Sequence, residues 1–263
     1  MNLKRIAARL LLKATNYRSL SFIWRRHFMG ERGYETKEII ESVIKKNLEF
    51  RKSGINQELS FENSKILTAV GIVTQMPREK QPIKVLDFGG GGGHCYWVAR
   101  RFFPEIQFEW HVVETEELCS AANLRLAREG LRFYKDLAEL PDTNVVYDLI
   151  FANSSIQYTK EPFETLKKIL EIGTSLLFIT RTPLAYGQTD YEYSQFSIAS
   201  ENGPGYITDT NPKVVSYECK ALSKTSLIYE VKKFFAVVDV LYEGTWDGKT
   251  RKVGTYSIIG RTP

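Results

Sequence analysis

An acidic residue and five consecutive glycines stand together in the stretch VLDFGGGGG, residues 85–93. Each glycine loses about 0.5–1 kcal/mol more than alanine on ordering, so five in a row need an explanation. The stretch is either a flexible linker or a place where a ligand approaches the backbone closely. It lies directly between a predicted strand and a predicted helix, where connections are short and ordered. We therefore expect a ligand-binding turn.

The spacing of these glycines separates two classes of ligand. The dinucleotide fingerprint G-x-G-x-x-G fails, because its third glycine would fall on His94 or Cys95. The register D-x-G-x-G-x-G is present, and its members are Asp87, Gly89, Gly91 and Gly93. A carboxylate at the strand end would repel a pyrophosphate and favour an ammonium or a sulfonium. The turn is therefore expected to bind a cationic ligand.

A second acid, Glu114, ends the next predicted strand. A carboxylate at this place can accept hydrogen bonds from both hydroxyls of a ribose. Glu114 therefore indicates a nucleoside without identifying it, and the alternative is an ordinary solvated acid. We expect both Asp87 and Glu114 to lie at a ligand rather than in the core.

Strands and helices alternate along most of the chain. Short apolar runs predict strands at 83–86, 108–114, 131–134, 147–152 and 175–180, with two longer strands at 233–243 and 255–261. Helical periodicity predicts helices at 34–52, 61–76, 94–103, 116–129 and 162–172. Residues 181–220 break this rhythm with Gly203-Pro204-Gly205 and many aromatic residues. The pattern predicts an α/β fold, a mostly parallel sheet with helices on both faces.

The D-x-G-x-G-x-G register resembles the first motif of class I S-adenosylmethionine-dependent methyltransferases. The resemblance implies S-adenosylmethionine as cofactor and a Rossmann-like seven-stranded sheet closed by an antiparallel hairpin. It also implies that Asp136 contacts the adenine amino group and that Asn153 faces the transferred methyl group. The expected domains are a helical arm and cap at 1–75 and the methyltransferase domain at 76–263, with a substrate-side insertion at 181–220.

A narrower resemblance concerns Gly33-Tyr34-Glu35 through Ser64, and Arg181-Thr182-Pro183-Leu184. These stretches resemble methyltransferases associated with bacterial capsule and O-antigen polysaccharide loci. The resemblance implies a sugar or glycan acceptor. A small metabolite or a lipid-linked acceptor is the nearest alternative, and a non-catalytic scaffold that keeps the cofactor fold is a third.

The residues after the fourth strand bear on the acceptor atom. Methyltransferases that act on exocyclic or side-chain amines carry an Asn/Asp-Pro-Pro-Tyr/Phe box here, whereas this chain has Asn153-Ser154-Ser155-Ile156. The missing prolines favour a hydroxyl or carboxyl acceptor. Tyr158 and Asp190 are the predicted proton acceptors, while His94 and His111 are expected to be structural. The insertion offers Arg181, Gln188 and Tyr191 as substrate-binding residues, although a lid or an oligomer contact is an equal alternative.

Charge is distributed unevenly along the chain. Residues 1–28 hold seven Lys and Arg and no acid, which leaves 29 bases against 31 acids, a net charge of −2, for the rest. The remainder therefore lacks the basic face of a nucleic-acid binder. The arm has one apolar and one basic helical face, which suits either an anionic membrane surface or packing on its own domain.

The cysteines and the apolar runs bear on the compartment. Three cysteines without metal-ligand spacing argue against a disulfide framework and a metal site. No apolar run reaches the roughly 20 residues that span a bilayer. We expect a cytoplasmic protein, at the inner face of the membrane if the arm binds lipid.

Overall fold

The computed structural model describes residues 29–33, 35–53, 61–77, 82–141, 146–187, 189–205, 207, 213–245 and 253–262. The N-terminal arm at 1–28 and the predicted substrate residue Gln188 lie outside these residues. Among the described helices, none combines the length and the apolar character needed to cross a membrane.

Five parallel strands form the centre of the sheet: β2 (Ile83–Phe88), β3 (Phe108–Val113), β4 (Leu131–Tyr134), β5 (Tyr147–Asn153) and β6 (Thr174–Ala185). Their order is β6-β5-β2-β3-β4. Helices connect them: α5 (His94–Phe102), α6 (Glu116–Arg125) and α7 (Pro162–Ile172). The chain leaves β2 toward β3 on one side and later returns to place β5 on the other. In such sheets ligands bind beyond the carboxyl ends of the strands where the order reverses, here between β2 and β5.

Two antiparallel strands close the sheet. The strand β10 (Val253–Arg261) lies between β6 and β9 (Val237–Thr245) and is antiparallel to both. The helix α8 (Lys224–Lys232) precedes β9. The predicted seven-stranded, mostly parallel sheet with a closing antiparallel hairpin is thereby confirmed.

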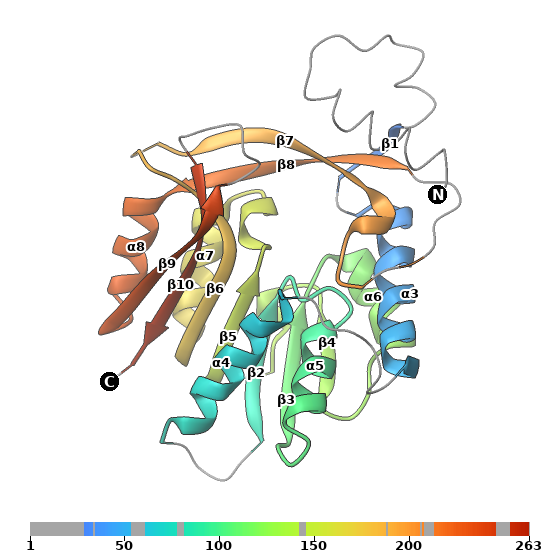
Figure 1. Cartoon of the computed structure of the whole chain (residues 1–263), viewed down its shortest axis with the longest axis horizontal. Helices are drawn as coiled ribbons and strands as arrows, with labels where there is room; N and C mark the ends of the chain where they lie inside the picture. The colour runs from blue at the N-terminus through green and yellow to red at the C-terminus, as the bar shows by residue number, and fades with distance from the viewer. Residues whose placement is uncertain are drawn as a thin grey trace.

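Three further strands extend this sheet: β1 (Met29–Arg32), β7 (Tyr191–Ile198) and β8 (Val214–Ser223). The strand β8 pairs in parallel with the end of β6 and with β1, and it pairs antiparallel with β7. Figure 1 shows β7 and β8 crossing above the central sheet from the side of α8 toward α3 (Lys37–Ser53). The insertion predicted at 181–220 therefore contains a strand pair that passes over the edge where ligands bind.

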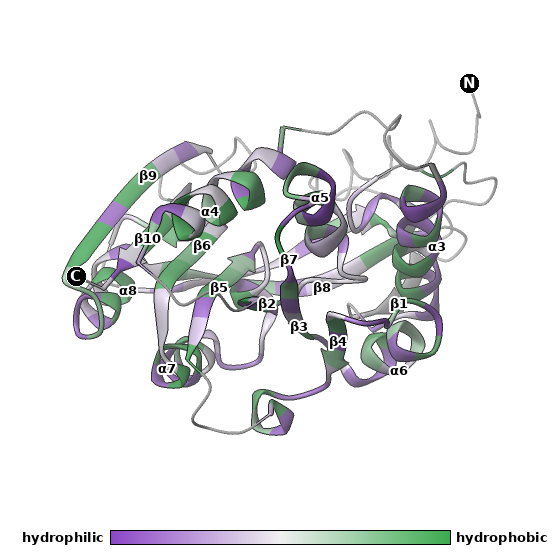
Figure 2. Ribbon diagram, turned by 90° about the horizontal axis from the view of Figure 1, so that it is seen from below, coloured by the Kyte–Doolittle hydropathy of each residue, from purple (hydrophilic) through white to green (hydrophobic). Residues whose placement is uncertain are grey.

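The two faces of the sheet are covered separately. Buried side chains of α3, α4 (Asn63–Gln75), α5 and α6 pack in one cluster with Val85, Trp110 and Leu149 of the sheet. Buried side chains of α7 and α8 pack with Leu86 and Ile150 in the other. Figure 2 shows α4 and α5 on one side of the sheet and α7 and α8 on the other. The alternation of side chains along each buried strand produces these two layers.

Several predicted boundaries are wrong. The helix predicted at 116–129 ends at Arg125, because residues 128–131 form a bridged turn around Gly130, whose φ is +78°. The strand predicted at 175–180 continues to Ala185, because β10 pairs with β6 from Leu176 to Ala185. The strand predicted from residue 233 begins at Val237, because the preceding residues belong to the unpredicted helix α8 and its end.

Candidate functional site

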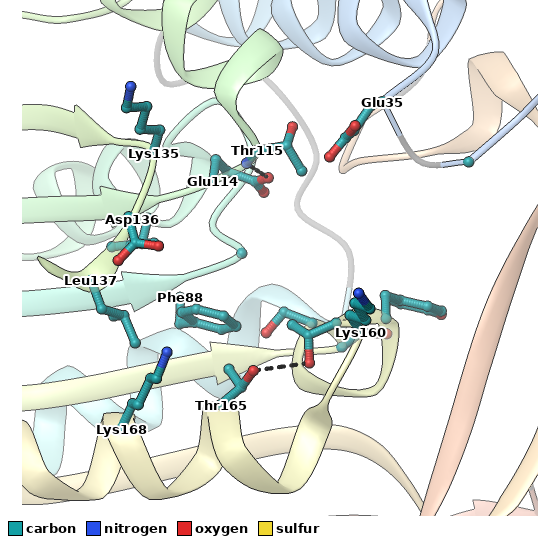
Figure 3. Close-up of a pocket in the computed structure, with 17 residues that line it drawn as sticks. Glu35, Phe88, Glu114, Thr115, Lys135, Asp136, Leu137, Lys160, Thr165 and Lys168 are labelled. Carbon is teal, nitrogen blue, oxygen red and sulfur yellow. Dashed lines mark hydrogen bonds between the residues drawn. The ribbon is translucent and has the colours of Figure 1, made fainter. Parts of the chain in front are cut away.

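A cavity of about 510 Å³ opens at the carboxyl ends of the central strands. It is bounded by the turn after β2, the ends of β3, β4 and β5, and the start of α7 (Figure 3). Gly33 and Glu35, which follow β1, also line it. Of the residues predicted to form a site, Gly89, Glu114, Asp136 and Tyr158 line this cavity.

The glycine stretch forms an ordered turn between β2 and α5, which excludes the linker interpretation. Gly89, Gly91 and Gly93, the three glycines of the predicted register, have φ values of +69°, +60° and +75°. Residues with a Cβ rarely adopt such angles. At Gly89 a Cβ would also lie 2.2 Å from Cβ of Ser155, on the neighbouring β5 side. Every second residue of this turn therefore has a left-handed backbone conformation, which explains why the motif requires glycine at every second position.

Asp87 lies beneath this turn and is buried in the core, contrary to the expectation that it lies outside the core, while its role at a ligand stays a prediction. Its side chain is 1% exposed, does not line the cavity and accepts a hydrogen bond of 3.1 Å from Trp110 Nε1. Burial raises the pKa of Asp87 to about 7, Trp110 opposes this shift and the Glu114 charge adds to it. Asp87 lies directly against the turn, since a Cβ at Gly90 would be 2.4 Å from its Cγ.

Glu114 connects the end of β3 to the glycine turn. Its carboxylate accepts hydrogen bonds from Gly91 N at 2.8 Å and from Thr115 N at 3.1 Å. Burial raises the pKa of Glu114, and these two N–H groups oppose the shift. Because two backbone donors fix the carboxylate at the cavity wall, its remaining acceptor positions are oriented for a ligand.

Asp136 and Asn153 occupy the strand ends on either side. Asp136 is exposed in the cavity wall and accepts a hydrogen bond of 2.8 Å from Ala138 N, which starts the short helix η2 (Leu137–Glu139). Asn153 ends β5 but does not line the cavity. Its buried Oδ1 has no hydrogen-bond partner in the part of the chain that the structure describes. The next residue, Ser154, lines the cavity with a φ of +55°.

The two predicted proton acceptors lie in different surroundings. Tyr158 lines the cavity, and its hydroxyl donates to Gln195 Oε1 of β7 at 3.0 Å. Burial raises the pKa of Tyr158 well above its usual range, and Cys219 and Tyr217 add to the shift. Asp190 is not part of the lining, and its Oδ1 accepts a 2.6 Å hydrogen bond from Ser223 N.

Two of the predicted substrate residues, Arg181 and Tyr191, lie outside the lining of the cavity. Arg181 has a φ of +54° and lies with Nε 3.4 Å from a carboxylate oxygen of Glu62. Tyr191 begins β7 and is half-buried.

The histidines expected to be structural are buried away from the cavity. His94 Nε2 lies 3.0 Å from Asn63 Oδ1, and burial lowers the pKa of His94 to about 4. His111 Nδ1 lies 2.8 Å from the Tyr147 hydroxyl. All three cysteines are free thiols.

Several residues of the lining are not predicted from the sequence: Glu35, Phe88, Leu137, Ser155, Lys160 and Lys168. The apolar members Phe88 and Leu137 directly follow or adjoin predicted motif residues, which is a signal that could have identified them. Glu35 has no such signal, because only the tertiary fold brings residues 33–35 against the end of β3.

Neither a protein-family model nor a curated protein matches this chain. Among solved structures it is similar to the N-terminal domain of EvdMO1, determined in the presence of SAH and D-fucose, with 15% identity, a TM-score of 0.51 and coverage of 88% of this chain and 100% of that chain. A S-adenosylmethionine-dependent methyltransferase from Clostridium acetobutylicum ATCC 824 has 14% identity, a TM-score of 0.46 and coverage of 78% and 94%. The glycopeptide N-methyltransferase MtfA has 13% identity, a TM-score of 0.43 and coverage of 80% and 93%. The chain has the Rossmann-like methyltransferase fold.

Proposed function

We propose that the protein transfers a methyl group from S-adenosylmethionine to a hydroxyl of a sugar or glycan. The observation that carries the proposal is the link between Glu114 and the glycine turn, in which the Gly91 N–H donates to the carboxylate at the edge of the cavity. This hydrogen bond holds the Glu114 carboxylate beside the glycine turn, whose backbone a ligand can approach closely.

The lining suits this cofactor in three respects. The acids Glu35, Glu114 and Asp136 favour a cationic ligand, and Glu114 presents acceptor positions to ribose hydroxyls. Phe88 and Leu137 offer apolar surface to a purine ring. S-Adenosylmethionine, when bound, supplies an electrophilic methyl group on a sulfonium that leaves as a neutral thioether.

The chain itself contributes mainly alignment. The acceptor oxygen must lie in line with the methyl carbon and the sulfur, and such orientation can contribute up to roughly 7–11 kcal/mol. With the cofactor bound, the methyl carbon would bond to the acceptor oxygen as its bond to sulfur breaks, and the hydroxyl proton would pass to solvent water. Ser154, Ser155 and Tyr158 line the cavity; Ser155 lies against Gly89 of the glycine turn, and Tyr158 contacts Gln195 of β7. We place the acceptor there.

The sugar or glycan acceptor, and a role in bacterial surface polysaccharide synthesis, rest on the sequence resemblance. The presence of D-fucose in the EvdMO1 structure adds support for a sugar. Asp190 remains a predicted proton acceptor, and Arg181, Gln188 and Tyr191 remain predicted contacts of the acceptor. Attachment of the arm at 1–28 to anionic lipid would bring the enzyme to membrane-bound intermediates, and it too remains a proposal.

Replacing Glu114 by alanine is expected to weaken binding of S-adenosylhomocysteine at least about 10-fold, since charged hydrogen bonds contribute about 1.5–3 kcal/mol each. Titration calorimetry on the wild type and the variant measures this. Glu117→Ala is a matched control, because Glu117 is on the exposed first turn of α6 and not in the lining. The function proposed here is wrong if the wild type binds NAD and not S-adenosylhomocysteine.

Replacing Tyr158 by phenylalanine distinguishes orientation from proton transfer. The raised pKa keeps the Tyr158 hydroxyl protonated at neutral pH. We therefore expect methyl transfer to fall only about 5- to 10-fold, as for one lost hydrogen bond, with an unchanged pH profile. The assay uses radiolabelled S-adenosylmethionine and an acceptor found by screening sugars and sugar phosphates. A loss of 100-fold or more with a changed pH profile would instead make Tyr158 the general base.

A further inference from the structure

The wall of the cavity formed by the start of α7 carries two lysines. Lys160 precedes this helix and Lys168 lies within it, and both side chains are exposed in the lining. Figure 3 shows the two side chains on either side of Thr165, with Lys168 directed away from the helix toward the cavity. Thr165 is also part of the lining, and its hydroxyl donates to Thr159 Oγ1 at 3.2 Å.

These two ammonium groups differ from the other lysines around them. The neighbouring lysines have carboxylate partners: Lys135 with Glu116 and Glu139 at 3.5 and 3.6 Å, Lys167 with Glu164 at 2.9 Å, and Lys220 with Glu192 at 3.0 Å. Within the described residues, neither Lys160 nor Lys168 has a hydrogen bond or an ion pair at its ammonium group. The positive charge at this wall is therefore not neutralised by the protein.

The opposite wall is mainly acidic. Glu35, which follows β1, lies there with Glu114 and Asp136 from the ends of β3 and β4. Lys135 also lines this wall, but its ammonium group is paired with Glu116 and Glu139. A cationic cofactor neutralises this acidic side and leaves the two lysines facing a site that β5 and α7 enclose. Two ammonium groups and nearby hydroxyls in one wall are a suitable environment for a phosphate or a carboxylate.

We propose, on the basis of the function proposed above, that the acceptor carries an anionic group, a phosphate or a carboxylate, and that Lys160 and Lys168 bind it. The reacting hydroxyl then lies on the same molecule, toward Ser154 and Ser155. An acceptor of this kind is a phosphorylated, nucleotide-linked or acidic sugar rather than a neutral one. The charge fixes the acceptor's position at the α7 wall while the cofactor occupies the glycine turn.

The test uses inorganic phosphate and acetate as probes of the full-length protein saturated with S-adenosylhomocysteine. Titration calorimetry compares the wild type, the double variant Lys160→Gln/Lys168→Gln and the control Lys167→Gln, which changes a lysine of the same helix that is ion-paired and outside the lining. We expect saturable binding of at least one probe to the wild type and the control, and at least 10-fold weaker binding to the double variant. Affinity for S-adenosylhomocysteine should stay within about 3-fold, because Glu114 and the glycine turn are unchanged.

Each other outcome has a defined meaning. If a probe binds the protein without S-adenosylhomocysteine but not the saturated protein, the lysines bind the cofactor's own carboxylate and the proposal is overturned. It is also overturned if neither probe binds saturably, or if the double variant binds as well as the wild type. If the lysine-dependent anion site is present but S-adenosylhomocysteine does not bind, the methyltransferase function fails while the anion site stands. The single variants replace the double variant if circular dichroism shows that it is unfolded.

Discussion

Replacing Gly90 by alanine is expected to abolish measurable binding of S-adenosylhomocysteine, a loss of at least about 100-fold. A Cβ at this position would lie 2.4 Å from Cγ of Asp87 and 2.5 and 2.8 Å from its two carboxylate oxygens. Asp87 cannot move aside easily, because it is enclosed in the core and bonded to Trp110. The turn must therefore shift, which separates Gly91 N–H from Glu114. Such overpacking costs typically about 1–3 kcal/mol of stability as well.

The control for this variant is Gly71→Ala in α4. Nothing lies within 4 Å of a Cβ at Gly71, and alanine is preferred over glycine in a helix interior by about 1 kcal/mol. We expect unchanged binding of S-adenosylhomocysteine and equal or higher stability in urea unfolding. Normal binding by a folded Gly90→Ala protein would show that the turn does not hold the cofactor.

The glycine turn could be predicted from the sequence because its information is local. The alternation of Gly89, Gly91 and Gly93 corresponds to alternate backbone conformations within one turn. The strand before it and the helix after it are also evident from their own periodicity. The burial of Asp87 could not be predicted, because it depends on Trp110 in the neighbouring strand, which the sequence does not place over it.

The position of the strand pair β7–β8 could not be predicted from the sequence for a different reason. The strand β8 is held by β7, by the end of β6 and by β1, and the β1 contact joins Met29 to Val214 across most of the chain. Only the tertiary fold brings such segments together. The helix α8 was missed because its buried face consists of only Leu227 and Val231. Its N-terminal signal was present, since the Ser223 hydroxyl accepts a hydrogen bond from Ser226 N.

The carboxyl group of Asp87 should make the stability of the protein depend on pH. Burial raises its pKa from 3.8 to about 7 in the folded state. At pH values between these two pKa values, the Asp87 carboxyl has lost its proton in the unfolded chain but keeps it in the folded chain. The folded state therefore binds more protons, and the free energy of unfolding falls as pH rises through this window. The contribution of Asp87 is fully present below about pH 4 and lost above about pH 7.

Replacing Asp87 by asparagine is expected to remove this dependence while keeping the fold. Its Oδ1 can still accept the hydrogen bond from Trp110, and the side chain has nearly the same volume. Relative to the wild type, the variant should gain up to about 4 kcal/mol between pH 4 and pH 8, since each pKa unit corresponds to about 1.4 kcal/mol. Urea unfolding at several pH values measures the difference, and Asp148→Asn, which replaces an acid that accepts a hydrogen bond from Lys84 N, is the control. Parallel pH curves for the wild type and Asp87→Asn would show that Asp87 is ionised in the folded protein. In that case the buried carboxylate would be a negative charge beneath the glycine turn, available to attract the sulfonium or ammonium of the cofactor.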